Sequence, residues 1–198
     1  MSAAPGPESL LDHRGNRRPT QHMPLDPWQA RLGMAFHEAG HAVVAMTYDV
    51  HVISSEIIAW SPEPGSFSVT GSTRFHGENV DLWRLAEQCA AGEIAQVQYL
   101  RAYGLWTPER AAACAAEHDR EYAIDTLAGF GYRLGRDHVP AGGKSWDMVK
   151  DLACRQVGRM WREIHTVAHA MTEHTKLTGE QIAAMTGLTN APLPGGAA

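Results

Sequence analysis

The chain has 198 residues, of which 44% are hydrophobic and 20% charged, an ordinary composition for a soluble globular protein. Its formal net charge of −5 argues against a nucleic-acid partner, because such proteins usually carry a basic face. No run of about 18 apolar residues predicts a membrane span, and the N-terminus lacks the apolar core of a secretory signal. Three scattered cysteines without C-x-x-C spacing favour reduced thiols and a cytoplasmic location.

One domain between two tails is expected. Residues 1–24 are rich in Pro, Gly, Arg and His, which is typical of a disordered or loosely draped tail. Residues 190–198 are rich in Ala, Pro and Gly and predict a flexible C-terminal tail. The segment 25–189 between them is long enough for one compact domain with a sizeable core.

The first helix is expected over residues 26–48. Asp26 can cap it, Pro27 suits the first helical position, and Gln29 stands where a capping box requires it. Two β-like runs follow, residues 51–60 and 66–75. Turn-forming residues join them, so they predict a hairpin or a small sheet.

The remainder of the chain is expected to be helical apart from a Gly-rich loop. The fold class is therefore mainly α with one small β-hairpin or sheet. The first of these helices is capped by Asn79 and reaches about Tyr103, and the second runs from Thr107 to about Leu127. After the loop, which covers residues 129–143, a long helix with one apolar stripe runs from about Ser145 through Met171. The last helix begins at Thr178, where Gln181 completes a capping box.

The chemistry centres on His37-Glu38-Ala39-Gly40-His41, within the first predicted helix. Residues four apart share one helix face, so both imidazoles can bind one metal ion, and neutral imidazoles suit zinc. Glu38 stands where its carboxylate can reach a water on the metal and act as general base. The pattern predicts one catalytic zinc ion per chain.

The alternative is a surface helix with two solvated histidines. Apolar residues 42–45 follow the motif directly, so this part of the helix is expected to be buried. Burying two histidines and a glutamate without partners would be costly, and a metal resolves that cost. Zinc also needs a third protein ligand, which spacing alone does not name. The candidates on later helices are Asp119, Glu93, Glu117, Glu121 and His118.

Residues 34–44 resemble the metal helix of the FtsH-type zinc proteases, which are AAA-coupled peptidases of membrane quality control. Residues 52–73 are similar to the family's following β segment. Residues 90–95 are similar to its small-residue helix containing Ala-Glu, and residues 117–123 to the segment with its third ligand. Residues 177–182 resemble the end of its peptidase domain.

The resemblance implies a helical, zincin-like metallopeptidase domain in which His37, His41 and Asp119 bind zinc and Glu38 is the catalytic base. Glu93 is the alternative ligand, or else a group that orients a histidine. The implied activity is that of a zinc metalloendopeptidase, a hydrolase of peptide bonds.

The sequence departs from the family because the AAA ATPase domain and the membrane helices have no counterpart in it. Residues 142–145 end like a phosphate loop, but the first glycine of that motif would fall at His138, so nucleotide binding is not expected. We expect ATP-independent cleavage of peptides or unfolded protein segments. A separate ATPase partner or a homo-oligomer is left open.

Two other functions fit the same residues. A zinc enzyme of another class could act on a small molecule on the same scaffold. A non-catalytic interaction domain could bind zinc structurally, although such a site has no use for Glu38.

Two further features carry hypotheses. His165 and His169 repeat the four-residue spacing, but Thr166 follows the first of them, and a solvated helix face is the simpler interpretation. Residues 66–73, if they form an edge strand near the zinc, could pair with an extended peptide. Val69→Pro should then impair peptide binding and leave the zinc content intact.

Overall fold

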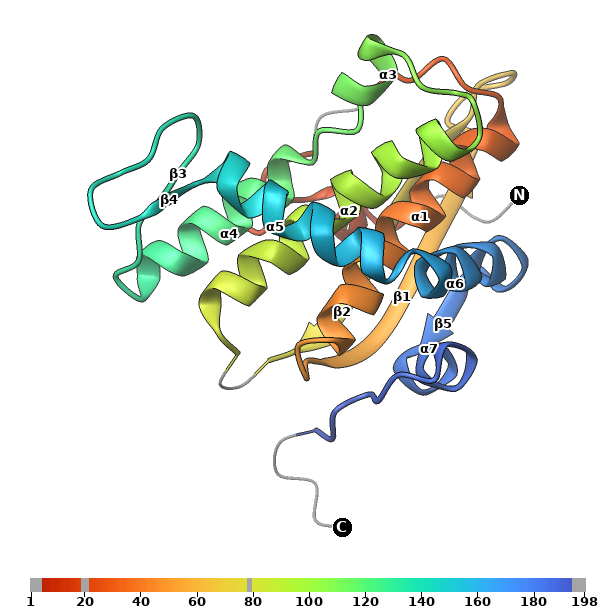
Figure 1. The fold of residues 1–198 in the computed structure, drawn as a ribbon. Coiled ribbons are helices and arrows are strands. Elements are labelled where there is room, and N and C mark those ends of the chain that lie inside the picture. The colour runs from red at the N-terminus through yellow and green to blue at the C-terminus, as the bar shows by residue number, and fades with distance from the viewer. Residues whose placement is uncertain (1–4, 19–21, 78–79, 194–198) are drawn as a thin grey trace.

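A single buried helix lies at the centre of the molecule in the computed structural model, which describes residues 5–18, 22–77 and 80–193 (Figure 1). This helix is α1 (Pro27–Met46), and it begins with the predicted capping box. The Asp26 side chain accepts a hydrogen bond from the Gln29 N–H at 2.9 Å, and the Gln29 side chain accepts one from the Asp26 N–H at 3.3 Å. Every residue from Ala35 through Met46 is buried, so the second half of α1 is enclosed on all sides.

The predicted hairpin is confirmed and forms part of a three-stranded antiparallel sheet. Its strands are β1 (His51–Trp60) and β2 (Ser68–His76), and β5 (Lys176–Thr178) pairs with the other side of β1. The strand order is β2-β1-β5, so β2 lies at an edge. The sequence analysis did not predict β5, because a three-residue strand is too short to show a period of two.

Helix α2 (Leu82–Ala102) packs along α1, on the side away from the sheet (Figure 1). The Asp81 side chain caps it by accepting hydrogen bonds from the Trp83 and Arg84 N–H groups. The predicted cap, Asn79, lies outside the described residues, and the helix begins later than the sequence suggested. The close packing of α1 and α2 brings the histidine motif against the small residues of α2.

The helix predicted over residues 107–127 is wrong, because the chain forms two helices there. They are α3 (Pro108–Ala112) and α4 (Glu117–Gly129). The intervening alanines favour helix by propensity, but Cys114 and Ala116 are buried, and Ala116 has the non-helical angles φ −93° and ψ 73°. Tertiary burial therefore overrides a local preference of a few tenths of a kcal/mol per residue. The break sets the direction of α4.

The prediction of one continuous helix from Ser145 is also wrong. The segment is divided at Met160 (φ −100°, ψ 16°) into α5 (Trp146–Arg159) and α6 (Trp161–His174). α5 packs on α2, whereas α6 packs on α1. The apolar stripe continues across the break, so hydrophobic periodicity could not reveal it.

The last helix, α7 (Gly179–Thr186), has the predicted capping box. The Thr178 hydroxyl accepts from the Gln181 N–H at 3.3 Å, and the Gln181 side chain accepts from the Thr178 N–H at 2.8 Å. One short parallel pairing joins β3 (Leu134–Gly135), inside the predicted Gly-rich loop of residues 129–143, to β4 (Lys144–Ser145), directly after that loop.

The described part of the N-terminal segment makes specific contacts where the sequence predicts a tail. It contains a 3-10 helix, η1 (Pro7–Leu10), and an antiparallel bridge between Leu11 and Arg17. Arg14 forms two hydrogen bonds with Asp125 on α4, from Nε at 2.6 Å and from Nη2 at 2.7 Å. At the other end of the chain, Asn190 makes hydrogen bonds with the N–H and the carbonyl oxygen of Val52. The start of the predicted C-terminal tail therefore lies against β1.

Stacked aromatic rings pack in the core beside the middle of α1. Phe36 stacks on Tyr99 of α2 at 5.0 Å and on Trp161 of α6 at 5.1 Å between ring centroids. Such pairs add to the free energy of burial and fix the rotation of α1.

A search of the helices in the described ranges finds none with the length and apolar composition of a membrane span.

Candidate metal centre

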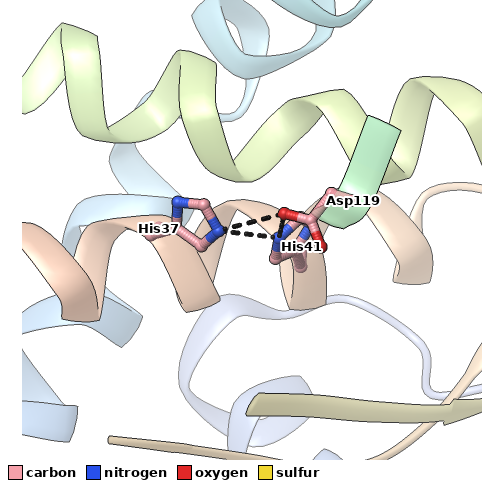
Figure 2. A group of neighbouring side chains, drawn as sticks. All are labelled: His37, His41 and Asp119. Carbon is pink, nitrogen blue, oxygen red and sulfur yellow. Dashed lines mark hydrogen bonds and ion pairs between the residues drawn. The ribbon is translucent and has the colours of Figure 1, made fainter. Parts of the chain in front are cut away.

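Three side chains from two elements converge on one point of the structure (Figure 2). The Nε2 atoms of His37 and His41, one turn apart on α1, lie 3.1 Å from each other. Oδ2 of Asp119, near the start of α4, lies 3.3 Å from the first nitrogen and 3.2 Å from the second. Two imidazoles and a carboxylate form a donor set that can bind a metal ion.

The small residues of α2 allow this convergence. A Cβ atom at Gly92 would lie 2.6 Å from His37 Nε2 and closer still to His41 Nε2, so only glycine leaves room for both rings. A Cβ atom at Gly40 would lie 2.6 Å from the carbonyl oxygen of Ala91. The absence of a side chain at Gly40 therefore lets α2 approach α1 closely.

The two imidazoles differ in how their second nitrogen is bound. Nδ1 of His41 lies 2.8 Å from the carbonyl oxygen of Gln88, to which it donates. This bond places the lone pair on Nε2, facing the other donors, as metal ligation requires. Nδ1 of His37 is buried without a hydrogen-bond partner in the described part of the chain.

The electrostatics of the group favour a bound cation. Burial by itself lowers the pKa of His41, but the charge of Asp119 and the hydrogen bond with it outweigh that effect and raise the pKa to about 9. Burial opposes ionisation of Asp119, yet the neighbouring imidazoles hold its pKa well below the ordinary value. A partly buried carboxylate with two buried nitrogen donors therefore binds positive charge, either as a proton or as a metal ion.

Glu38 lies beside the donor group and contacts the edge strand. Its Oε2 accepts a hydrogen bond from the Thr73 hydroxyl at 2.7 Å. A Cβ atom at Gly71 would lie 2.7 Å from Glu38 Cδ, so the strand can approach the carboxylate only because residue 71 is glycine. Two residues of β2 thus determine where the carboxylate lies, although neither belongs to the histidine motif.

Glu93, the alternative ligand, does not join the group. Its carboxylate lies 3.8 Å from Lys150 Nζ of α5. Burial raises the pKa of Glu93, and Lys150 together with a hydrogen bond from the Ala116 backbone opposes the rise. Ala116 is the residue before α4, so Glu93 contacts the turn that orients the helix with Asp119.

The other ligand candidates on α4 have separate partners. Glu117 is exposed and pairs with Arg120, and Glu121 pairs with Arg136 through a 2.8 Å hydrogen bond. His118 Nε2 lies 3.3 Å from Asp119 Oδ1, on the side away from the two histidines. Burial lowers the pKa of His118 to about 4, although the charge of Asp119 acts in the opposite direction, so this imidazole is neutral at pH 7.

A cleft of about 90 Å³ reaches the donor group from the surface. Its lining includes Glu38, His41 and Asp119, residues Gly71 to Thr73 of the edge strand, and Arg18 of the N-terminal segment. Two of the three donor residues, His41 and Asp119, and the Glu38 side chain therefore line one accessible space.

Sequence reasoning missed several residues that shape this centre. Gly92, Gly71 and Thr73 control the space around the ligands, and Gln88 contributes only a backbone oxygen. The small-residue run that ends at Gly92 was visible in the sequence. The contacts of the others depend on which strand and helix lie beside α1, and no local pattern reports that.

Comparison with known proteins gives no family for this chain: no protein-family model matches it, and no curated protein matches it either.

Proposed function

We propose that the chain is a zinc-dependent metallopeptidase with a zincin-like peptidase domain of the FtsH type. The observation that carries this proposal is the position of Glu38. Its carboxylate lies in the same cleft as His41 and Asp119, with Thr73 bound to one of its two oxygens. A general base beside an open metal site is the arrangement that hydrolysis requires.

The spacing of the donor atoms supports zinc as the metal. Two ligands about 2.0–2.1 Å from a tetrahedral zinc ion lie about 3.3–3.4 Å apart. The three pairs of donor atoms here are separated by 3.1, 3.2 and 3.3 Å. Two histidines and one aspartate also resemble the His₂-carboxylate ligand sets of catalytic zinc sites.

The chain's own groups divide the catalytic work. Bound zinc would supply Lewis acidity toward water and the scissile carbonyl. Glu38 Oε1 takes a proton from the attacking water and delivers it to the leaving amine. Thr73 donates to Glu38 Oε2, which limits rotation of the carboxylate and keeps the other oxygen in the cleft. Gln88 keeps His41 in the tautomer that a metal needs.

An extended peptide is the substrate that fits the wall of the cleft. β2 is an edge strand, and its residues Gly71 to Thr73 line the cleft. The backbone groups on an unpaired edge can form a ladder with an added strand. The cleft favours a peptide over a small molecule, because it runs along the edge strand and lies open at the surface.

The structural-zinc alternative is less well supported. Structural sites have four protein ligands, whereas the described residues bring three donors together. A buried glutamate beside the group also has no role in a structural site.

The experiment is metal analysis combined with cleavage of a peptide library by the wild type and two variants. Glu38→Gln should keep one zinc per chain and lower the cleavage rate by about 10²–10⁴-fold, the usual contribution of a general base. Glu173→Gln, an exposed glutamate on α6, is the matched control and should leave the rate unchanged. A Glu38→Gln variant with wild-type cleavage would refute the mechanism, and a wild type that binds zinc and cleaves no peptide would favour the small-molecule alternative.

A further inference from the structure

A second and larger cavity, of about 400 Å³, adjoins the metal cleft. It lies over the face of the sheet that points away from α1. The two cavities share three lining residues, Arg18, Gly71 and Ser72. They therefore meet at the middle of the edge strand, where a peptide paired with β2 would pass.

Strand geometry links the two cavities to one substrate. Successive side chains of an extended peptide point to opposite faces of the sheet. A peptide added to β2 would direct alternate side chains toward the metal cleft and the ones between them toward the second cavity. The chemistry of the second cavity would then select residues close to the scissile bond.

The lining of the second cavity carries an excess of positive charge. Its cations are Arg18, Arg74 and Lys176, and its anions are Glu8 and Glu56. Lys176 pairs with Glu56 at 3.1 Å, so these two charges compensate each other. Neither arginine has a carboxylate within 4.0 Å in the described part of the chain, so two guanidinium groups face one exposed glutamate.

Arg18 is held in place by its own segment. Its Nε donates to the carbonyl oxygen of Leu11 at 2.9 Å, across the turn closed by the Leu11–Arg17 bridge. The same turn is bound to α4 through Arg14 and Asp125. One further contact runs 3.4 Å from Nη1 to His118 Nε2, and the described residues offer no partner to the other guanidinium N–H donors, which can bind a ligand.

We propose that Arg18 and Arg74 form a subsite for a carboxylate of the substrate, so that the enzyme selects acidic peptides. The inference rests on the proposed function and specifies its substrate class. The carboxylate comes from an aspartate or glutamate side chain, or from the peptide's C-terminus. Arg18 is the specificity-determining residue, because it lines both cavities and its planar donors match a carboxylate.

The test measures binding to the zinc-loaded Glu38→Gln protein, in which cleavage does not disturb the equilibrium. The probes are fluorescein-labelled octapeptide pools with one aspartate at a central position, and matched pools with asparagine there. Each pool is made with a free and with an amidated C-terminus, which separates the two sources of the carboxylate. We expect the acidic pools to bind about tenfold more tightly than the neutral ones.

Arg18→Gln should abolish this preference, whereas Arg17→Gln should leave it unchanged. Arg17 is the matched control, because it is the neighbouring arginine, is exposed and lines neither cavity. Equal binding of acidic and neutral pools by the parent protein would overturn the proposal. Equal losses in the Arg17 and Arg18 variants would overturn it too, because they would indicate only unspecific attraction.

Cleavage of the same pools by the full chain separates this inference from the proposed function. If no pool is cleaved but the Arg18-dependent preference in binding persists, the subsite stands and the peptidase proposal fails. If all pools are cleaved equally and Arg18→Gln changes nothing, the peptidase stands and the subsite is refuted.

A third variant tests whether the N-terminal segment forms the wall of the groove or blocks it. Arg14→Ala removes the bonds to Asp125 and loosens the segment. If the segment presents Arg18 to substrate, kcat/KM should fall severalfold for the acidic pools alone. A rise in kcat/KM for every pool would identify the segment as an inhibitory strap and would overturn the subsite.

Discussion

Two pairs of histidines in this protein share the same spacing and have different surroundings. His37 and His41 lie one turn apart on α1, with ring centroids 4.8 Å apart. His165 and His169 lie one turn apart on α6, with ring centroids 4.3 Å apart. Local helix geometry is therefore equivalent in the two pairs, and any difference in function has to come from other elements.

The neighbours of the second pair leave it no need for a metal. Both Nε2 atoms contact the Tyr103 hydroxyl, at 3.2 Å from His165 and 2.7 Å from His169. A hydroxyl can accept one hydrogen bond and donate another, so it satisfies both rings. His165 is also exposed, and water can reach it.

The first pair contacts the partly buried carboxylate of Asp119 in place of a hydroxyl. His37 and His41 are only 5% and 6% exposed, and both nitrogens face Asp119. Three such atoms brought together at a largely buried site are stabilised by positive charge, either a proton or a metal ion. The i, i+4 spacing thus positions two imidazoles, whereas a distant anion and burial make them a candidate metal centre.

The largest expected effect contrasts the two pairs directly. His37→Ala removes one of three donors and should abolish both zinc binding and cleavage. His165→Ala should leave both unchanged, because Tyr103 can still bond to His169. Zinc per chain after dialysis is the measurement. Zinc lost from the second variant and kept by the first would reverse the assignment.

A smaller effect is expected from the space around the first pair. Gly92→Ala places a methyl group against both Nε2 atoms and should weaken zinc binding by on the order of 100-fold. Gly158→Ala is the matched control, because nothing lies within 4 Å of its added Cβ on α5. That change should leave zinc affinity unaltered and stabilise the fold by about 0.5–1 kcal/mol. Chelator competition and urea unfolding measure the two quantities, and equal zinc affinities in the two variants would contradict the role of Gly92.

The pH dependence of zinc binding should reflect the first pair and not the second. Because the pKa of His41 is raised to about 9 without metal, zinc must displace a proton at neutral pH. The association constant should rise about tenfold per pH unit from pH 7 and level off near pH 9. Competition titrations with a chelator of known protonation constants give this slope, and a slope of zero over that range would contradict it.

The same proton makes the metal-free fold pH-dependent. Because the pKa of His41 is about 9 in the folded state and about 6.5 for an ordinary histidine, its proton stabilises the fold fully below pH 6.5, and this stability is lost as the pH rises toward 9. The pKa of His169 is lowered, first by burial and then by His165, so its contribution changes only below pH 6.5. The free energy of unfolding between pH 6.5 and 9 should therefore lose its slope in His41→Gln and keep it in His169→Gln.

The smallest effect is expected at Glu93, which the sequence offers as the alternative to Asp119 as third ligand. Glu93→Gln keeps an oxygen that can accept from the Ala116 N–H and removes only the 3.8 Å ion pair with Lys150. Zinc affinity should change by less than about threefold, and stability by less than about 1 kcal/mol. Isothermal titration with zinc measures the affinity. A loss as large as that in Asp119→Asn would show that Glu93 is a ligand after all.

Sequence reasoning predicted the ends of elements better than their interruptions. The capping boxes at Asp26 and Thr178 and the hairpin turn are encoded within a few residues, and all three are confirmed. The breaks before Ala116 and at Met160 are set by what the chain packs against, and the local sequence continues through both without a signal.

Local spacing predicts that the His37 and His41 imidazoles lie one turn apart, with Glu38 directly after the first, on a helix too apolar to be exposed, because these relations follow from 3.6 residues per turn and from the cost of burial. Helix packing then selects the distant carboxylate that completes the group. Asp119 reaches it and Glu93 does not, because the turn before α4 directs one side chain toward α1 and α5 holds the other with a lysine. That choice depends on the packing of helices far apart in the chain, where spacing along the sequence carries no information.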